Sequence, residues 1–308
     1  MIVLPWRPPC PGIIHSVIDP IALHLGPIQV HWYGIILASA ILFAAWLGTA
    51  ETRRRGEDPE TGWSALLWVT AAGVIGARLY HVISQWDFYA ANPGLIPQVW
   101  NGGLGIPGAV AGGAIVLWAY TRWKGLPTAR WLDIFVMAVP LGQAIGRLGN
   151  FVNQELYGPP TTLPWGIPID AGHRVPEWAN LTLYPVATTR FVPLFAYEAV
   201  LSLVTLGLML WISRRFAARL YDGDMLLIFI MCYGLVRSYL ETFRVQNWVI
   251  AGVPTATWLG LGGFLLAGGY LWLRHARGWG TPGAWIKKPE EADVAAPASG
   301  GSPEAQPG

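Results

Sequence analysis

The sequence AIGRLGNFVNQELYG, residues 144–158, joins a long apolar run to a polar, proline-rich segment. Arg147 stands at that junction. An arginine held at bilayer depth costs about 2.5–3.5 kcal/mol, so membrane helices keep one mainly for a partner or a ligand. Gly146 and Gly149 lie beside it and allow a backbone or a phosphate to approach closely. The stretch therefore indicates a functional helix end; a snorkelling arginine before an ordinary polar loop is the structural alternative.

The composition of the whole chain is that of a membrane protein. Of 308 residues, 53% are hydrophobic and only 12% are charged, with a mean hydropathy of +0.40. Soluble domains carry about 25% charged residues. The net charge of +2 argues neither for nor against nucleic acid, but Lys and Arg lie in short clusters between apolar runs. We therefore expect no nucleic-acid partner.

Seven apolar stretches of about 20 residues predict an all-α integral membrane protein, a bundle of seven transmembrane helices. The predicted spans are Val30–Ala50, Ala65–Ser84, Leu104–Thr121, Leu132–Asn150, Leu194–Ser213, Met225–Phe243 and Thr255–Leu273.

The segments outside these spans predict the domain organisation. Residues 151–193, between the fourth and fifth spans, are too long for a plain connection and predict a small extracytoplasmic cap. Within it we expect short strands around 163–169 and 181–186. Residues 1–29 are expected to form an extracytoplasmic N-terminal segment without a cleavable signal peptide. The transmembrane domain covers 30–275, and the tail at 276–308 has a composition typical of disorder.

The distribution of basic residues predicts the orientation. Loops after the first, third, fifth and seventh spans, together with the tail, hold 13 of the 20 Lys and Arg, and the other side holds four. Because positive charge favours the cytoplasmic side, the N-terminus is expected outside and the C-terminus in the cytoplasm.

The sixth span carries a polar stripe. Tyr233, Arg237, Glu241 and Arg244 fall within about an 80° arc of a helix with 100° per residue, so they are expected to face the bundle interior or a cavity. Arg237 and Glu241 also have the spacing of an ordinary ion pair, which is the structural alternative. Near the spans, four arginines (Arg78, Arg147, Arg237 and Arg244) outnumber two glutamates (Glu198 and Glu241), which favours binding of an anion such as a lipid phosphate.

Other motifs point to packing or are missing from the sequence. Gly108 and Gly112 form a small-xxx-small pattern, whose ordinary use is close helix packing. His31, His81 and His173 share no metal-ligand spacing, and there is no G-x-S-x-G, H-E-x-x-H or Walker motif. We therefore expect no metal site and no cofactor.

The motif quoted first resembles a known signature. GRLGNFVNQELYG at 146–158 is similar to the pattern G-R-x-G-N-F-x-N-x-E-x-x-G of the prolipoprotein diacylglyceryl transferases, with every fixed position filled. Five further stretches are similar in the same order, so that the resemblance covers about residues 25–275: HWYG at 31–34, GARLYHV at 76–82, WNGGL at 100–104, Tyr197-Glu198, and YGLVRSYLETFR at 233–244.

The resemblance implies a multi-pass enzyme of the bacterial inner membrane with two substrates, phosphatidylglycerol and prolipoprotein signal peptides with a lipobox cysteine. The diacylglyceryl group moves to the cysteine thiol, a thioether forms and glycerol-1-phosphate leaves. The implied catalytic residues are Arg147, Arg237, Glu241 and Tyr33. The implied phosphatidylglycerol-binding residues are Arg147, Asn150, Asn153, Glu155, Gly158, Tyr233 and Arg244. In this scheme the arginines hold the phosphate, and Glu155 and Glu241 orient them.

The chain departs from the family pattern at two histidine positions. Pro107 stands where many members carry a histidine proposed as the base for the thiol, and Val192 stands where another histidine is common. Proline cannot accept a proton, so no catalytic histidine is assigned. A thiol with a pKa of about 8.5 needs only modest help, which nearby arginines can give.

Two other functions remain open at the level of sequence. A transporter or flippase of an anionic lipid could use the same arginines, although such proteins favour inverted repeats and none is visible. A catalytically inactive relative that binds lipid is the second alternative, because of Pro107.

Overall fold

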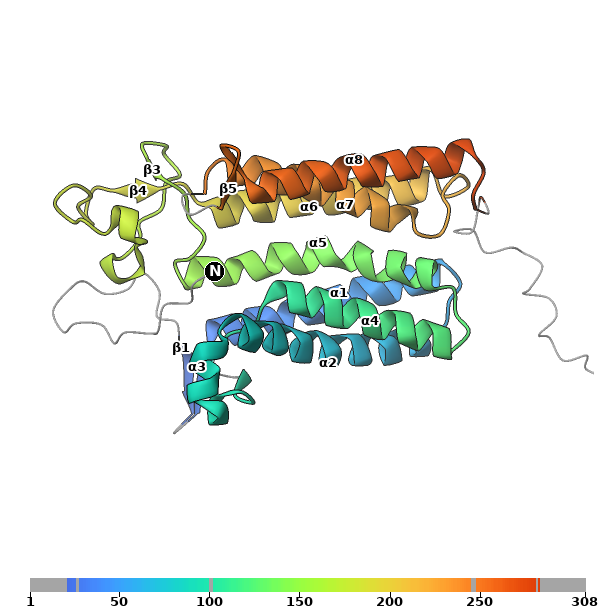
Figure 1. Cartoon of the computed structure of the whole chain (residues 1–308), viewed down its shortest axis with the longest axis horizontal. Coiled ribbons are helices and arrows are strands. Elements are labelled where there is room, and N and C mark those ends of the chain that lie inside the picture. The colour runs from blue at the N-terminus through green and yellow to red at the C-terminus, as the bar shows by residue number, and fades with distance from the viewer. Residues whose placement is uncertain (1–20, 26–27, 100–101, 245–247, 281, 283–308) are drawn as a thin grey trace, which may run out of the picture.

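The computed structural model describes residues 21–25, 28–99, 102–244, 248–280 and 282. Within this part, five helices are long and apolar enough to cross a membrane, which confirms a mostly helical membrane protein. They are α1 (Trp32–Arg54), α2 (Pro59–Ser84), α5 (Thr128–Val152), α6 (Leu194–Arg215) and α8 (Thr255–Ala276). Two helices of 18 residues, α4 (Ile106–Trp123) and α7 (Asp224–Glu241), lie in the same bundle (Figure 1).

Helix α5 occupies the centre of the bundle. In Figure 1, α6, α7 and α8 lie on one side of it, and α1, α2 and α4 lie on the other. It packs directly against α1, α4, α6 and α7. The motif at its C-terminal end is therefore placed between both halves of the molecule.

Glycines set the close helix pairs. A Cβ atom on Gly108 would lie 2.1 Å from the carbonyl oxygen of Gly76, and one on Gly112 would lie 2.5 Å from that of Ala72. Helices α2 and α4 thus touch backbone to backbone, which confirms close packing at this small-xxx-small pattern. Gly234 and Gly260 bring α7 and α8 together in the same way.

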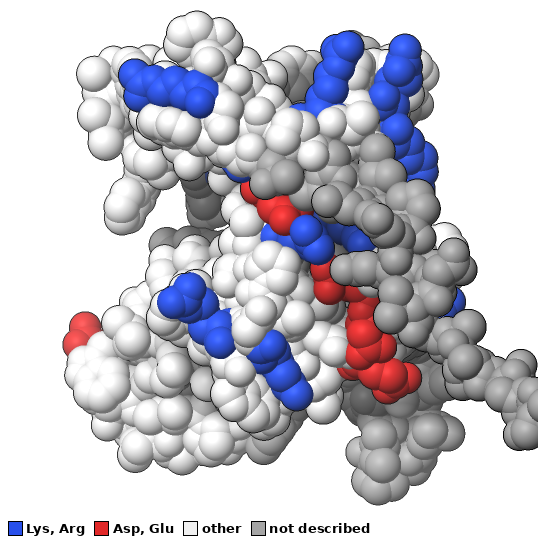
Figure 2. Space-filling view, turned by 90° about the vertical axis from the view of Figure 1, so that its right-hand side faces the viewer, with Lys and Arg blue, Asp and Glu red and all other residues white. Residues whose placement is uncertain are grey.

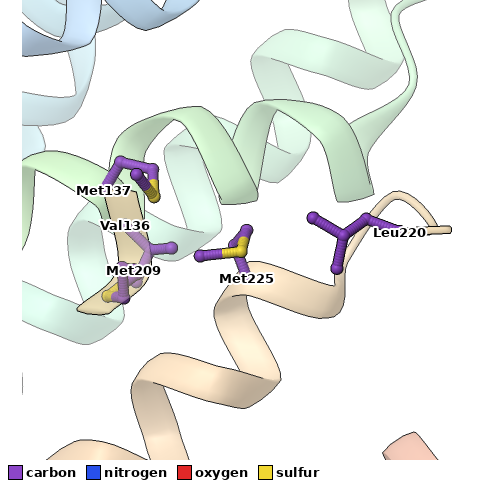
Figure 3. Close-up of a cluster of buried hydrophobic side chains, with 5 residues drawn as sticks. All are labelled: Val136, Met137, Met209, Leu220 and Met225. Carbon is purple, nitrogen blue, oxygen red and sulfur yellow. The ribbon is translucent and has the colours of Figure 1, made fainter. Parts of the chain in front are cut away.

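The end of the bundle opposite the cap is held by apolar side chains and by buried carboxylates, of which Asp133 is one. Figure 3 shows the apolar cluster of Val136, Met137, Met209, Leu220 and Met225. Beside it, Asp133 of α5 is fully buried and accepts hydrogen bonds from the backbone N–H groups of Gly223 (2.7 Å) and Leu226 (2.9 Å). Asp133 thereby satisfies donors at the start of α7 that have no partner within the helix.

The cap has less strand than the sequence suggested. Its paired strands are β3 (Pro160–Thr161) and β4 (Arg190–Phe191), and its helical turns are η3 (Ala171–His173) and η4 (Pro176–Trp178). The strands expected around 163–169 and 181–186 are wrong, because these segments form turns apart from one bridge between Ile167 and Phe191. Prolines 164, 168 and 185 explain the difference, since proline removes a donor from the ladder.

Small elements line the same end of the bundle as the cap. They are the hairpins β1 (Ile21–Leu25) with β2 (Ile28–His31) and β5 (Val249–Ile250) with β6 (Val253–Pro254), the short helix α3 (Trp86–Ala91) and the turn η1 (Pro93–Leu95). The first hairpin was not anticipated in the 1–29 segment. Residues 1–20 and most of the expected disordered tail, 283–308, lie outside the described residues.

Candidate active site at the end of helix α5

The last turns of α5 place three polar groups of the motif in one chain of contacts. Arg147 and Asn150 are three residues apart, so they share a helix face. The Arg147 Nη1 atom donates to Asn150 Oδ1 at 3.0 Å, and Asn150 Nδ2 donates to Glu155 Oε2 at 3.4 Å. Asn153 caps the C-terminal end of α5. Glu155 therefore reaches Arg147 through Asn150, so its expected part in orienting an arginine would be exerted through that side chain.

Glu198 of α6 is the carboxylate that holds Arg147. Its Oε1 atom accepts a hydrogen bond from Arg147 Nη2, and its Oε2 atom lies 3.9 Å from Arg244 Nη2. Glu198 is 8% exposed, so both contacts are shielded from solvent. The sequence analysis included the charge of Glu198 but did not assign this residue to the site. The signal that could have indicated it is the Tyr197-Glu198 pair, which is similar to the family.

The end of α7 contributes a second ion pair to the site, between Arg237 and Glu241. Arg237 Nη2 lies 2.9 Å from Glu241 Oε2, which is the predicted i, i+4 pair, and Arg244 Nε lies 3.9 Å from the same oxygen. Tyr233, one turn before Arg237, is 42% exposed and stacks on Phe229 with ring centroids 5.8 Å apart. The structure thus joins three members of the stripe and places the fourth at its edge.

Among the directly paired charges of this cluster, the positive ones outnumber the negative ones. Within the directly paired set, three arginines (147, 237 and 244) share two glutamates (198 and 241). Burial and the neighbouring Arg237 lower the pKa of Arg244, and Glu198 and Glu241 oppose that shift. Because arginine keeps its charge at neutral pH, a partly buried group of three guanidinium groups and two carboxylates is suited to bind an anion.

Tyr33 reaches the motif from α1. A Cβ atom on Gly149 would lie 2.8 Å from Tyr33 Cδ2, so the ring lies directly on the glycine backbone. The absence of a side chain at 149 is what admits the tyrosine. This contact places the Tyr33 ring of α1 against the motif helix at Gly149, which is next to Asn150 and two residues after Arg147 in the sequence.

Gly158 fastens the loop after the motif to the start of α6. Its N–H donates to the carbonyl oxygen of Val192 at 2.8 Å, and an added Cβ would lie 3.2 Å from Val192 Cβ and 3.3 Å from the Phe243 carbonyl oxygen. Close backbone packing thus explains the glycine at this position.

Arg78 was counted among the arginines that favour anion binding, but the structure gives it a different role. It is 6% exposed, and its guanidinium donates to four carbonyl oxygens, those of Leu95, Ile96, Gly102 and Gly103, at 2.6–3.1 Å. These bonds hold the glycine-rich segment before α4. Arg78 is therefore a structural arginine, and the expectation that it adds to an anion site is wrong.

The fold and the site define a class. The chain is a multi-pass helical membrane protein in which an arginine-rich, carboxylate-braced cluster lies at the end of the bundle beside the cap. Residues 20–273 match the family described as prolipoprotein diacylglyceryl transferase, and the chain belongs to that family.

Individual relatives agree over most of their length. The chain is 38% identical over 272 residues to the phosphatidylglycerol–prolipoprotein diacylglyceryl transferase of Chloroflexus aggregans, covering 83% of this chain and 89% of that protein. It is 39% identical to the protein of the same name from Symbiobacterium thermophilum, covering 77% and 85%. For that from Geobacillus kaustophilus the identity is 34%, covering 85% and 94%.

Proposed function

We propose that this protein transfers the diacylglyceryl group of phosphatidylglycerol to the lipobox cysteine of prolipoprotein signal peptides. The observation that carries the assignment of the site is the cluster of three arginines braced by Glu198 and Glu241 at the end of α5 and α7. It lies in a protein of membrane helices, where the anion supplied is a lipid phosphate.

The reaction explains why this cluster has excess positive charge. The cysteine sulfur attacks the glyceryl carbon, a C–S bond forms, and the C–O bond to the phosphate breaks with its electron pair leaving on oxygen. The phosphate goes from a diester with one negative charge to a monoester with a second. Fixed positive charge binds that product-like state more strongly than the starting lipid, which lowers the barrier.

The proposed roles follow from the contacts. Arg147 and Arg237 hold the phosphate and stabilise the leaving charge, and Glu241 and Glu198 fix the two guanidinium groups. Glu241 can also take a proton. Tyr33, packed on Gly149, would donate a hydrogen bond to the lipid head.

The remaining binding residues surround this pair. Asn150, Asn153 and Glu155 supply polar atoms at the end of α5, Arg244 adds charge, Tyr233 lies at the edge, and Gly158 keeps the loop close. The thiol proton needs an acceptor other than residue 107, where proline is exposed in the first turn of α4. We expect no cofactor, because electrons balance between the thiol and the phosphate leaving group.

We further propose seven spans in the inner membrane, with the N-terminus and the cap outside. α7 carries three charged residues, Asp224, Arg237 and Glu241, whereas α4 carries one, Arg122. Both pack along full-length membrane helices, α4 on α2 and α7 on α8. In this proposal, residues 30–275 form the transmembrane catalytic domain and 151–193 form its cap. Residues 1–29 and 276–308 are the flanking segments.

The Lys and Arg side chains at the end of the bundle opposite the cap support this orientation, because positive charge favours the cytoplasmic side. Figure 2 shows that end, with Lys and Arg side chains spread across it around a strip of Asp and Glu. An Asn180→Cys variant in which Cys10 and Cys232 are replaced by serine tests it, because a membrane-impermeant thiol reagent should then label position 180 in intact cells. Labelling only after the membrane is opened would reverse the topology.

The activity is tested in proteoliposomes that contain the purified protein, phosphatidylglycerol and a lipobox peptide. We expect a mass gain of one diacylglyceryl group on the peptide cysteine, absent when that cysteine is serine or when phosphatidylglycerol is omitted. Lipid movement between leaflets without a mass gain would favour a flippase. Lipid binding alone by folded protein would favour an inactive relative.

A further inference from the structure

A pair of side chains fastens the cap to the motif loop. Gln154 Nε2 donates to Asp170 Oδ2 at 2.7 Å, and the backbone N–H of Asp170 donates to Gln154 Oε1 at 2.7 Å. Both groups of the Gln154 amide are therefore used by one residue of the cap. Gln154 is 7% exposed, so water competes little for either bond.

The loop that this pair holds has an unusual backbone. Gln154 has φ of 51° and Leu156 has φ of 55°, the left-handed region that side chains other than glycine rarely adopt. Such residues persist only where their surroundings determine them. Leu156 is held by its carbonyl oxygen, which accepts from Phe195 N–H at 3.0 Å, and by packing against the buried cluster of Val192, Leu194 and Leu240. Gln154 is held by Asp170.

Glu155 lies between these two residues, so their conformation decides where its side chain points. Its N–H donates to the Asn150 carbonyl oxygen at 2.8 Å, and its carboxylate accepts from the Asn150 side chain. Asn150 in turn accepts from Arg147. A displacement at Gln154 therefore passes to the arginine through two hydrogen bonds.

Asp170 is itself fixed within the cap. It precedes the turn η3, and its carbonyl oxygen accepts from His173 N–H at 3.0 Å. Next to it, the buried guanidinium of Arg174 donates to the Ile169 carbonyl oxygen at 3.0 Å and lies 5.1 Å from the centre of the Phe191 ring. The cap thus presents Asp170 on a rigid support.

We infer that Gln154 and Asp170 are positioning residues for diacylglyceryl transfer, and that the cap acts on the reaction through this pair. The inference rests on the proposed site at Arg147. Its physical basis is that transfer depends on the placement of polar groups around the phosphate, and a displacement of about 1 Å can cost on the order of 100-fold in rate.

The test exchanges the donor and acceptor roles of the pair without changing its shape. Gln154→Glu sets two carboxylates against each other and should lower the transfer rate by roughly 10- to 100-fold. Adding Asp170→Asn restores both bonds, because the new glutamate accepts from the asparagine amide and from the same backbone N–H. The double variant should recover a rate within a few-fold of wild type. Asp170→Asn alone should stay active, since its carbonyl oxygen still accepts from Gln154.

Rates are measured in proteoliposomes per folded protein, with folding followed by thermal unfolding in detergent. Asn180→Ala is the matched control: Asn180 Oδ1 accepts from the N–H groups of Thr182 (3.0 Å) and Leu183 (3.3 Å), and both bonds stay inside the cap. It should transfer at the wild-type rate. If Gln154→Glu does not fold, Asp170→Ala replaces it, because it removes the acceptor without adding charge and should also lose rate.

Wild-type rates in Gln154→Glu or Asp170→Ala would overturn the inference, and so would a folded double variant as slow as Gln154→Glu. Arg147→Ala, measured in parallel, distinguishes failure of the positioning role from failure of the proposed site. If Arg147→Ala is inactive while the Gln154 and Asp170 variants are normal, only the positioning role fails. If Arg147→Ala is fully active, the proposed site itself is wrong.

Discussion

Arg147 on α5 and Glu198 on α6 form a salt bridge, and the second carboxylate oxygen of Glu198 lies 3.9 Å from Arg244 Nη2. One buried glutamate thus joins two arginines from different parts of the chain. Each arginine would otherwise repel the other. The site is consequently assembled around a carboxylate that does not belong to the motif.

Glu198→Gln should fold and lose activity. The amide keeps a hydrogen bond to Arg147 but not the charge that holds Arg147 and Arg244 together. A charge-assisted hydrogen bond contributes roughly 1.5–3 kcal/mol, so we expect transfer to fall about tenfold or more. The assay is the mass gain of the lipobox peptide at equal folded protein. Unchanged transfer would mean that Glu198 is only a structural partner.

Arg147→Ala should remove transfer, by at least about 100-fold, because a fixed group that stabilises developing charge is lost. Arg147→Lys should recover only part of it, since lysine supplies the charge without the planar fork that binds two oxygens. The comparison requires both variants in the same vesicles. Equal rates for lysine and arginine would show that charge alone is sufficient.

Gly149→Ala should lower transfer while leaving the helix at least as stable. The new methyl group would lie 2.8 Å from Tyr33 Cδ2 and force the ring away from the motif, although alanine is the better helix former. Gly142→Ala is the matched control, since a Cβ there has no neighbour within 4 Å. Gly149→Ala should add little to the loss in Tyr33→Phe; a fully additive loss would mean that the glycine acts independently of Tyr33.

Pro107→Ala should transfer at nearly the wild-type rate. Pro107 is exposed in the first turn of α4, where the missing N–H has no partner within the helix in any case. The readout is again the modified peptide. Complete loss of transfer would show that this residue contacts a substrate, contrary to our assignment.

Asp133→Ala should destabilise the protein strongly. Removal of this carboxylate leaves the start of α7 without its acceptor and leaves Arg55 Nη1, 3.8 Å away, facing no charge at that position. Breaking a buried pair costs about 3–5 kcal/mol. The measurement is thermal unfolding in detergent. Asp58→Ala, which removes an exposed acceptor for the first turn of α2, should cost much less; equal losses would contradict the burial argument.

Much of the helical framework was predictable because it depends on neighbours in sequence. Length and hydropathy determine which stretches can cross a membrane, and the helical period places Arg237 beside Glu241 and Arg147 beside Asn150. Close packing at Gly108 and Gly112 follows from the same period. The regular geometry of one helical turn is enough to bring these residues into contact.

The tertiary structure alone decided which distant groups meet. The bridge from Glu198 to Arg147 spans 51 residues, Tyr33 lies on Gly149 from another helix, and Gln154 is bound by the cap. Arg78 donates hydrogen bonds to backbone carbonyl oxygens instead of binding an anion. The cap forms turns where strands were expected, because proline lacks the N–H donor of a strand pair. Composition and periodicity describe each segment separately, whereas these contacts depend on how α1, α5, α6 and the cap pack in space, which no local pattern encodes.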